Sequence, residues 1–535
     1  MDKNPSLAGK QPSPAAAGSR GSESPAVTLR SVWSPLMLAL VGAGWLLLAF
    51  PPFDQGWLGW LAPVPLFLLA LGPWQRPGLW GLLAGFLFFL LHLTWMARFS
   101  APGWVAAALI SGAWIGLAVG LGRRLAITVP PGWRSLALAA TWTAAEWGRS
   151  LGPLGFTWGD LAVSQHRCPV ALQLLDLTGS CGLSFLMAWL AASLAEALVK
   201  PPGSGSRRLW RLAAAGAAVA LSLGRGLWLL TTPLPPSPVL RVGVVQGSIS
   251  YPSDQPYVDV QSAPEGYYPL TRGAGSARAQ LIVWGEAATW DDLLASPTLQ
   301  QELAGMAQQY HARILTGSFD RSPTRGLTNS AFLLDARGRI VDRYDKVFLV
   351  PMGEYLPLRW LWPSAAILGA PRRDMTPGRA FRPVRDGDLQ VGVAICFESA
   401  FGRITREQVR NGANLLALLT SDSWRDRRNA ALQHEAMAPL RAVETRRSVV
   451  RAANAGISDL IDPYGRRVAE IPLFQQDFRV ATLPLREDRT LYVRLGDWPG
   501  YLSALTMAAW CLWRGRQPRK LSGLPQAASP PGKTD

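Results

Sequence analysis

Long uncharged apolar segments dominate the N-terminal part of the chain. Five of them contain no Asp, Glu, Lys or Arg: residues 32–53, 55–75, 77–97, 99–122 and 177–195. A helix needs roughly 20 apolar residues to cross the hydrocarbon core of a bilayer, which is about 30 Å thick. Each of the five segments therefore predicts a membrane-spanning helix.

Three weaker apolar segments show the same pattern less clearly. Residues 135–150 include Glu146, residues 209–230 include Arg225, and residues 498–513 number only 16. By length alone, such segments are typical of helices buried in a soluble core. The positions of the basic residues favour a different interpretation.

Lys and Arg gather at four places, and short cytoplasmic loops of membrane proteins collect these residues. The groups are Lys3, Lys10, Arg20 and Arg30; Arg123, Arg124 and Arg134; Lys200, Arg207, Arg208 and Arg211; and Arg514, Arg516, Arg519 and Lys520. All four can face the cytoplasm only if the three weaker segments also cross the membrane. The sequence thus predicts about eight spans, two cytoplasmic termini and an extracytoplasmic segment. The net charge of +17 is then mostly an orientation signal, and nucleic acid is not an expected partner.

These boundaries divide the chain into five parts. Residues 1–30 are predicted to form a disordered cytoplasmic tail, 31–231 a bundle of seven spans, 239–490 a catalytic domain, 498–513 the last span and 514–535 a second cytoplasmic tail. The two tails are rich in Pro, Ser, Gly and Ala, which is typical of disordered segments.

The extracytoplasmic segment has the pattern of a soluble α/β domain. Short β-branched runs that end in turn residues predict strands at 240–246, 280–284, 313–317, 390–395, 415–419 and 449–452. Turn sequences at 335–338 and 462–465 predict two hairpins, and 298–310 and 430–444 have helical patterns. Strands that alternate with helices favour a sheet covered by helices.

Three chemically suited residues follow predicted strands of this domain. Lys346 is the only lysine between residues 201 and 519, in a chain with 47 Arg and 6 Lys, and Cys396 is the only cysteine between 182 and 510. Glu286 follows the strand at 280–284. Loops after strands are where α/β folds place their chemistry. The alternatives are an ordinary surface lysine and an inert core cysteine.

A thiol, a carboxylate and an ammonium suffice for acyl transfer. The carboxylate takes the thiol proton, the ammonium stabilises the thiolate and the tetrahedral oxyanion, and the thiolate forms a thioester. The sequence predicts no histidine-based triad, and His311 and His434 are too few for a zinc site. No Gly-rich phosphate loop is found, so neither a metal nor another cofactor is expected.

The sequences around these residues resemble the Glu-Lys-Cys triad of the nitrilase superfamily. Glu286 ends Leu-Ile-Val-Trp-Gly-Glu, Lys346 lies in Tyr-Asp-Lys-Val-Phe-Leu-Val-Pro-Met-Gly-Glu-Tyr-Leu-Pro, and Cys396 lies in Ala-Ile-Cys-Phe-Glu. The Lys346 segment and the eight-span layout are similar to the membrane branch of that superfamily, the apolipoprotein N-acyltransferases. Glu146-Trp-Gly-Arg149 and the following Gly155-Phe-Thr-Trp158 are similar as well, so the resemblance covers about residues 33–515.

The resemblance implies a two-step reaction in a bacterial cytoplasmic (inner) membrane. Cys396 would take an acyl chain from a phospholipid as a thioester and pass it to the α-amino group of the N-terminal diacylglyceryl-cysteine of an apolipoprotein. The implied fold is a polytopic α-helical membrane domain plus a nitrilase-like α/β sandwich on the periplasmic side. Supporting or substrate-contacting roles would fall to Glu354, Phe397, Glu398 and Trp424.

The chain departs from the family pattern at three places, and two other functions fit it. Gly285 and Thr157 stand where the family often has Pro, and residues 250–257 lack a usual Lys-Trp pair. The first alternative is a membrane-anchored nitrilase-type amidohydrolase with water as the final acceptor. The second is a non-enzymatic scaffold or transporter, for which the evidence would be ionisable residues in or near the spans: Glu146, Asp176, Glu196 and Arg225.

Overall fold

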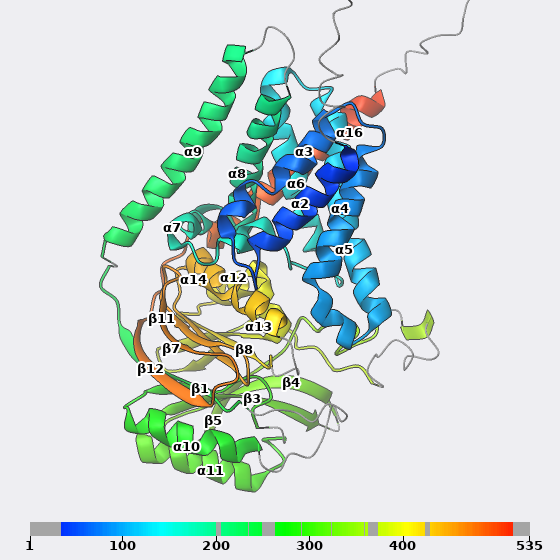
Figure 1. Ribbon diagram of the computed structural model, residues 1–535. Coiled ribbons are helices and arrows are strands. Elements are labelled where there is room, and N and C mark those ends of the chain that lie inside the picture. The colour runs from blue at the N-terminus through cyan, green and yellow to red at the C-terminus, as the bar shows by residue number, and fades with distance from the viewer. Residues whose placement is uncertain are drawn as a thin grey trace, which may run out of the picture.

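The molecule has a helical region at one end and an α/β region at the other (Figure 1). The computed structural model describes residues 34–199, 205–233, 235–248, 263–289, 292–322, 324–357, 359–361, 373–422 and 428–516. All statements below concern these residues. The predicted N-terminal tail, residues 517–535 of the predicted C-terminal tail and the segment 250–257 lie outside them, whereas residues 514–516 belong to the last helix.

Helices coincide with the eight apolar segments of the sequence. They are α2 (Pro35–Ala49), α3 (Pro63–Leu71), α4 (Pro77–His92), α5 (Ala101–Ala126), α6 (Arg134–Arg149), α8 (Leu175–Leu198), α9 (Gly205–Thr231) and α16 (Trp498–Arg516). A proline lies in the first turn of α2, α3, α4 and α5, where the missing N–H has no helical partner to lose. Among the described helices, α5, α8 and the part Leu209–Thr231 of α9 are long and apolar enough to cross a membrane. The helical region therefore has three candidate spans, and the full set of eight stays a prediction.

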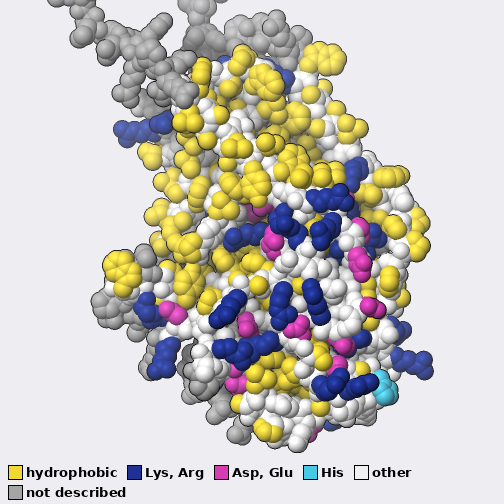
Figure 2. All heavy atoms as spheres, turned by 180° about the vertical axis from the view of Figure 1, so that it is seen from behind, with side chains coloured by type: hydrophobic (Ala, Val, Ile, Leu, Met, Phe, Trp, Pro, Cys, Tyr) yellow, Lys and Arg dark blue, Asp and Glu magenta, His cyan; other side chains and the backbone are white. Residues whose placement is uncertain are grey.

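Apolar side chains cover the surface of the helical region, whereas Arg, Lys, Asp and Glu gather on the α/β region (Figure 2). Large apolar residues on the outward faces of the helices are strongly exposed, including Ile110, Trp210, Leu221 and Leu505. A soluble protein rarely exposes a continuous apolar surface of this extent. This distribution is typical of a region that contacts lipid.

Two six-stranded sheets form the α/β region. The first has the order β12-β1-β2-β3-β4-β5 and the second β11-β10-β9-β8-β7-β6. Their strands are β1 (Val239–Gln246), β2 (Leu281–Val283), β3 (Arg313–Ser322), β4 (Gly326–Leu334), β5 (Ile340–Asp345), β6 (Val384–Asp386), β7 (Leu389–Ile395), β8 (Leu415–Thr420), β9 (Val449–Ala453), β10 (Ser458–Ile461), β11 (Arg467–Ile471) and β12 (Asp477–Pro484). The strands β1–β3 and β7–β9 pair in parallel at the centre of each sheet.

An apolar core fills the space between the sheets. Val391, Val393 and Ile395 of β7 belong to this core, whereas Ala394 packs on the opposite face of the same strand. All six residues of β8 are buried. Strands buried on both faces need apolar residues at every position, which explains the continuous apolar runs in the sequence.

Helices cover the outer face of each sheet. The first sheet carries α10 (Ala263–Ser276) and α11 (Pro297–Tyr310), and the second carries α12 (Gly402–Arg410), α13 (Arg428–Glu435) and α14 (Ala438–Thr445). The latter three lie between the sheet and the helical region (Figure 1). Leu440 and Val443 of α14 share one apolar cluster with Leu183 and Met187 of α8. The two regions are therefore joined by a common core.

The predicted α/β architecture is confirmed, but one predicted helix is wrong in its extent. The six predicted strands correspond to β1, β2, β3, β7, β8 and β9, and the two predicted hairpins to β4–β5 and β10–β11. The predicted single helix at 430–444 is instead divided into α13 and α14. Pro439 lies in the first turn of α14, because proline suits a helix start and disrupts a helix interior.

Candidate active site

Strand ends bring Glu286, Lys346 and Cys396 together. Glu286 follows β2 of the first sheet, and its N–H donates to the carbonyl of Thr420 in the second sheet at 3.2 Å. Lys346 directly follows β5, and Cys396 directly follows β7 as the first residue of the short helix η7 (Cys396–Ala400). The structure thus places the three predicted residues where the two sheets meet.

Lys346 is a buried ammonium between two carboxylates. Its side chain is 1% exposed, and Nζ lies 2.7 Å from Oε1 of Glu354 and 3.7 Å from Oε1 of Glu286. Burial alone would lower the pKa of Lys346, but Glu354 and Glu286 raise it above its ordinary value. Lys346 is therefore a permanently charged group and no surface residue.

Glu286 contacts both of the other predicted residues. Asn329 of β4 donates from Nδ2 to Oε1 of Glu286 at 2.8 Å, and the Cys396 thiol lies near enough to the same carboxyl group to lower its pKa. Burial raises the pKa of Glu286, and Lys346 opposes this rise. A carboxylate with a raised pKa is a stronger base, which suits a group that takes a proton from a thiol.

Cys396 occupies a tight turn in a strained conformation. Its φ of 53° lies in the left-handed region, which costs a non-glycine residue roughly 1–2 kcal/mol. Burial raises the pKa of the thiol well above its ordinary value, Glu286 adds to this rise, and Lys346 opposes it. The resting thiol is therefore protonated, so it needs a base before it can act as a nucleophile.

Glu398 contacts backbone groups, in contrast to Glu354, which contacts Lys346. Its carboxylate is fully buried and accepts from the Tyr344 hydroxyl at 2.9 Å and from the N–H groups of Val347, Phe348 and Ile395 at 2.8–3.0 Å. It thereby ties the loop after Lys346 to the strand before Cys396. Burial raises the pKa of Glu398 to about 7, although these hydrogen bonds oppose the rise.

Aromatic side chains pack together beside the turn that holds Cys396. The Phe397 ring stacks on Trp158 with centroids 5.8 Å apart and on Phe348 at 5.7 Å. Phe397 is 8% exposed, so its ring is a buried member of this aromatic cluster. Trp424, the remaining predicted residue, lies outside the described residues.

Several polar residues at the site are not marked by the sequence pattern. Asn329 bridges Glu286 and Glu354, with Nδ2 3.3 Å from Oε1 of Glu354. Ser399, His434 and Asp422 form a hydrogen-bonded Ser-His-Asp chain beneath Cys396. Only a single histidine was needed, so the low histidine count excluded zinc but could not exclude this arrangement.

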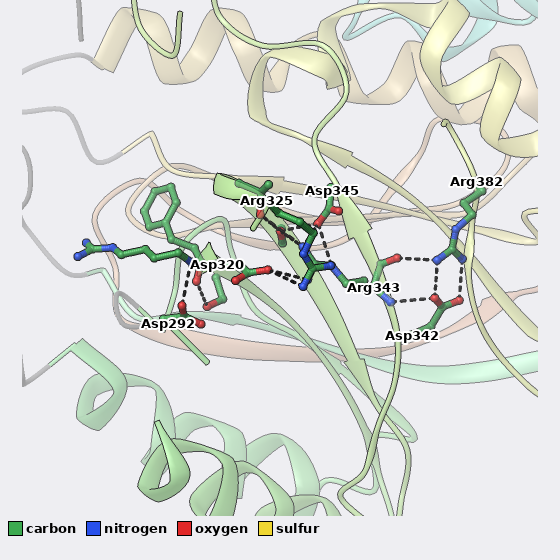
Figure 3. Close-up of polar contacts among 12 residues, drawn as sticks. Asp292, Asp320, Arg325, Asp342, Arg343, Asp345 and Arg382 are labelled. Carbon is green, nitrogen blue, oxygen red and sulfur yellow. Dashed lines mark hydrogen bonds and ion pairs between the residues drawn. The ribbon is translucent and has the colours of Figure 1, made fainter. Parts of the chain in front are cut away.

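A network of Arg and Asp residues supports the strand before Lys346 (Figure 3). Arg343 of β5 donates to Asp320 of β3 at 2.7 Å and, through Nε, to Asp345 at 2.9 Å. Arg382 binds Asp342 through two hydrogen bonds of 2.8 and 3.0 Å. The Arg343–Asp320 pair links β5 to β3 and so fixes the strand end from which Lys346 projects, whereas the Arg382–Asp342 pair joins β5 to the segment before β6.

The ionisable residues of the helical region have structural partners. Asp176 of α8 binds Arg225 of α9 at 2.9 Å and Arg446 of the α/β region at 2.8 Å. Glu146 accepts from Trp142 at 2.8 Å and from the N–H of Leu161 at 2.9 Å. Such contacts join helices to each other and to the α/β region, which removes much of the evidence for a transport pathway.

The departure at Thr157 is compensated within the same segment. The Thr157 hydroxyl donates to the carbonyl of Ala400 in η7 at 3.1 Å. The neighbouring Trp158 packs on Phe397, as described above. The loop between α6 and α8 therefore directly contacts η7, the short helix that begins at Cys396.

Two family models match the chain. The model described as carbon-nitrogen hydrolase matches residues 241–490, and the model described as apolipoprotein N-acyltransferase N-terminal domain matches residues 42–193. The first range contains Glu286, Lys346 and Cys396. The second lies in the helical region.

Similar proteins cover most of the chain. An apolipoprotein N-acyltransferase of Gloeobacter violaceus is 32% identical over 511 residues, which is 90% of this chain and 94% of the relative. One of Geobacter metallireducens is 32% identical over 383 residues, covering 69% of this chain and 72% of the relative. A solved amidase from Nesterenkonia sp. is 19% identical with a TM-score of 0.37, covering 52% of this chain and 98% of its own.

Proposed function

Because the chain belongs to the apolipoprotein N-acyltransferase family, we propose that Glu286, Lys346 and Cys396 form its catalytic triad. The enzyme is an acyltransferase, and its function is the N-acylation of lipoproteins. The observation that supports the triad is the convergence of the three side chains: Nζ of Lys346 lies 3.7 Å from Oε1 of Glu286, and the charges of both residues act on the Cys396 thiol.

The first half of the proposed reaction loads the enzyme with an acyl chain. Glu286 takes the thiol proton, and the Cys396 thiolate attacks an ester carbonyl of a membrane phospholipid. Lys346 stabilises the negative charge that develops on the carbonyl oxygen. The tetrahedral intermediate then expels the lysophospholipid alkoxide, which takes the proton from Glu286, and the acyl group remains on sulfur as a thioester.

The second half transfers the chain to a lipoprotein. The α-amino group of the diacylglyceryl-cysteine attacks the thioester and gives a proton to Glu286. The C–S bond breaks, and Cys396 leaves as a thiolate that takes the proton back. Glu354 supports both halves because it keeps Lys346 charged and positioned, and Glu398 supports them through the backbone around the site. Trp424 and Phe397 remain candidates for substrate contact.

We further propose that all eight apolar helices span the bacterial inner membrane. Both termini then face the cytoplasm, residues 31–231 form seven spans, residues 498–513 form the last, and the catalytic domain at 239–490 faces the periplasm. Support comes from the basic clusters of the sequence and from the apolar surface of the helical region (Figure 2). This placement gives the site access to phospholipid and to translocated lipoproteins.

Replacement of the nucleophile tests the proposed triad. Wild type and Cys396→Ala are incubated with phospholipid but no acceptor, and intact-protein mass spectrometry then measures the acyl adduct. Wild type should carry one hydroxylamine-labile acyl group, and Cys396→Ala should carry none, because a thioester needs the thiol. Cys181→Ala, which removes another partly buried cysteine, is the matched control and should load normally. An equal adduct on Cys396→Ala would refute the assignment.

A subsequent addition of a diacylglyceryl peptide separates acyl transfer from hydrolysis. The transferase should release an N-acylated peptide. Release of free fatty acid with unmodified peptide would favour the amidohydrolase alternative.

A further inference from the structure

A chain of buried polar side chains ends at the carbonyl oxygen of the nucleophile. Nε2 of His434 lies 3.1 Å from the carbonyl oxygen of Cys396 and 2.7 Å from Oγ of Ser399. Nδ1 of His434 lies 3.0 Å from Oδ1 of Asp422, whose Oδ2 binds Arg451 at 2.5 Å. Each of these four side chains is at most 9% exposed. The chain joins α13 and the ends of β8 and β9 to the turn that holds Cys396.

The chemistry of the partners determines where the hydrogens lie. Burial alone would raise the pKa of Asp422, but Arg451 and His434 hold it well below its ordinary value, so Asp422 is ionised and can only accept. Nδ1 of His434 must therefore donate. The Cys396 carbonyl can also only accept, and the Ser399 hydroxyl donates to it at 2.7 Å. Nε2 of His434 lies between this hydroxyl oxygen and the carbonyl, so it acts as a second donor to the carbonyl when the ring carries a proton on both nitrogens.

Two donors acting on one carbonyl fix the orientation of a peptide plane. The peptide between Cys396 and Phe397 is planar, so its N–H points opposite to its C=O. Because His434 and Ser399 hold the C=O behind the turn, the N–H of Phe397 points away from them. An N–H fixed beside the nucleophile can stabilise an oxyanion without reorganisation during the reaction. The strained φ of 53° at Cys396 means that the turn needs such anchors.

The membrane-side loop closes off the same histidine. The Trp158 ring lies 5.7 Å from the His434 ring, and the Thr157 hydroxyl binds the carbonyl of Ala400 at the other end of η7. His434 is 5% exposed. The imidazole is therefore held against the turn and is shielded from solvent.

We propose that His434 is a positioning residue, which, with Ser399, holds the Cys396 carbonyl so that the Phe397 N–H faces the acyl oxyanion. The proposal rests on the proposed function of Cys396 as the nucleophile. It assigns no proton transfer to His434 and no covalent step to Ser399. It differs from a purely structural role because it concerns only reactions that form an oxyanion.

Two reactions of the same thiol test the proposal in the full-length enzyme. Iodoacetamide alkylates the thiolate by direct displacement at carbon and forms no oxyanion, whereas acylation by phospholipid passes through one. Peptide mass spectrometry measures both rates at Cys396, because the chain has other free cysteines. His434→Asn keeps a donor toward Asp422, and His434→Gln keeps a donor that reaches the Cys396 carbonyl. His311→Gln is the control, because His311 is an exposed residue at the end of α11.

The expected result is a split between the two reactions and between the two amides. His434→Asn should slow acylation by about 10–100-fold, below the 10²–10³-fold loss of a complete oxyanion donor. Alkylation should stay within about twofold of wild type, and His434→Gln should recover most of the acylation rate. Ser399→Ala, which removes one donor and leaves His434 in place, should slow acylation by only a few fold, and His311→Gln should change neither rate.

Other results would overturn the proposal. An unchanged acylation rate in His434→Asn would show that the anchor is dispensable, and an equal loss of both reactions would indicate a displaced thiol or a misfolded turn. An ester on Ser399 in wild type, lost in Ser399→Ala together with activity, would make Ser399 a nucleophile. If wild type carried no acyl group on Cys396, the proposed function would fail before any His434 variant was compared.

Discussion

Two buried glutamates of the site, Glu354 and Glu398, differ in whether a charged side chain is among their hydrogen-bond donors. Glu354 accepts from the Lys346 ammonium at 2.7 Å, from Asn329, and from the N–H of Val350 at 2.7 Å. Glu398 accepts only from a tyrosine hydroxyl and backbone N–H groups. One carboxylate balances the charge of Lys346, for which we propose a role on the substrate, whereas the other holds two backbone segments together. The partner, more than the residue type or its burial, therefore determines the role.

The largest effect is expected when the charged partner of Glu354 is replaced. Lys346→Arg keeps the charge but should slow acylation by about 10²–10³-fold, because a planar guanidinium cannot occupy a site that is closed around a compact ammonium. The acyl adduct on Cys396 measures the rate. Arg382→Lys, at an exposed ion pair, is the control and should have little effect. Near-normal acylation by Lys346→Arg would mean that only the charge matters.

Glu354→Gln should have the next largest effect, a loss of about 10²-fold in acylation. Without Glu354, Glu286 is the remaining carboxylate at Lys346, so the ammonium stabilises the ionised form of Glu286 and weakens it as a base. The melting temperature should change little in comparison. Glu302→Gln, an exposed residue of α11, serves as the control. A large decrease in melting temperature with unchanged acylation would instead indicate that Glu354 has a purely structural role.

Glu398→Gln should show the reverse pattern. An amide presents N–H groups where the protein already supplies N–H donors, so at least one buried donor loses its acceptor, at a cost of about 1–3 kcal/mol. The melting temperature in detergent should fall by several degrees, while acylation per folded molecule changes less than in Glu354→Gln. Comparable losses of rate in both variants would remove the distinction between the two glutamates.

The remaining effect is a dependence of stability on pH, which leaves the rate of acylation aside. The pKa of Glu398 is about 7 in the folded protein and ordinarily 4.5, so the folded state binds the proton more tightly. This contribution is complete below pH 4.5, declines as the pH rises through 7, and is constant above that, with a total of about 3 kcal/mol. The stability gap between wild type and Glu398→Gln should therefore be wider at pH 5 than at pH 8. A gap that is independent of pH would contradict this pKa.

The parts of the site that the sequence could predict are those with an unusual residue at a strand end. Lys346 and Cys396 stand out because their residue types are rare in this chain, and Glu286 follows a clear strand. The same patterns predicted the central strands, because buried parallel strands need continuous apolar runs. Glu354 and Glu398 were expected from family resemblance, but their different partners were not.

Asn329 and His434 had no such signal. Asn329 reaches Glu286 across 43 residues of chain, and His434 reaches the Cys396 carbonyl across 38. Their roles depend on which strand ends become neighbours when the two sheets form. Local patterns of hydrophobicity and turns do not carry that information, and neither do the identities of single Asn or His residues.

The pairing of β1 with β12 has a consequence for the synthesis of the protein. Val239 pairs with Pro484 and Gln246 with Asp477. One edge of the first sheet can therefore form only after β12, the last strand of the α/β region, has been synthesised. Ribosomes add about 5–20 residues per second, so roughly 10–50 seconds pass between the two strands. During that interval an unpaired strand edge is open to wrong partners. We expect a nascent chain that stops before residue 477 to engage chaperones, and a chain that has passed residue 484 to release them.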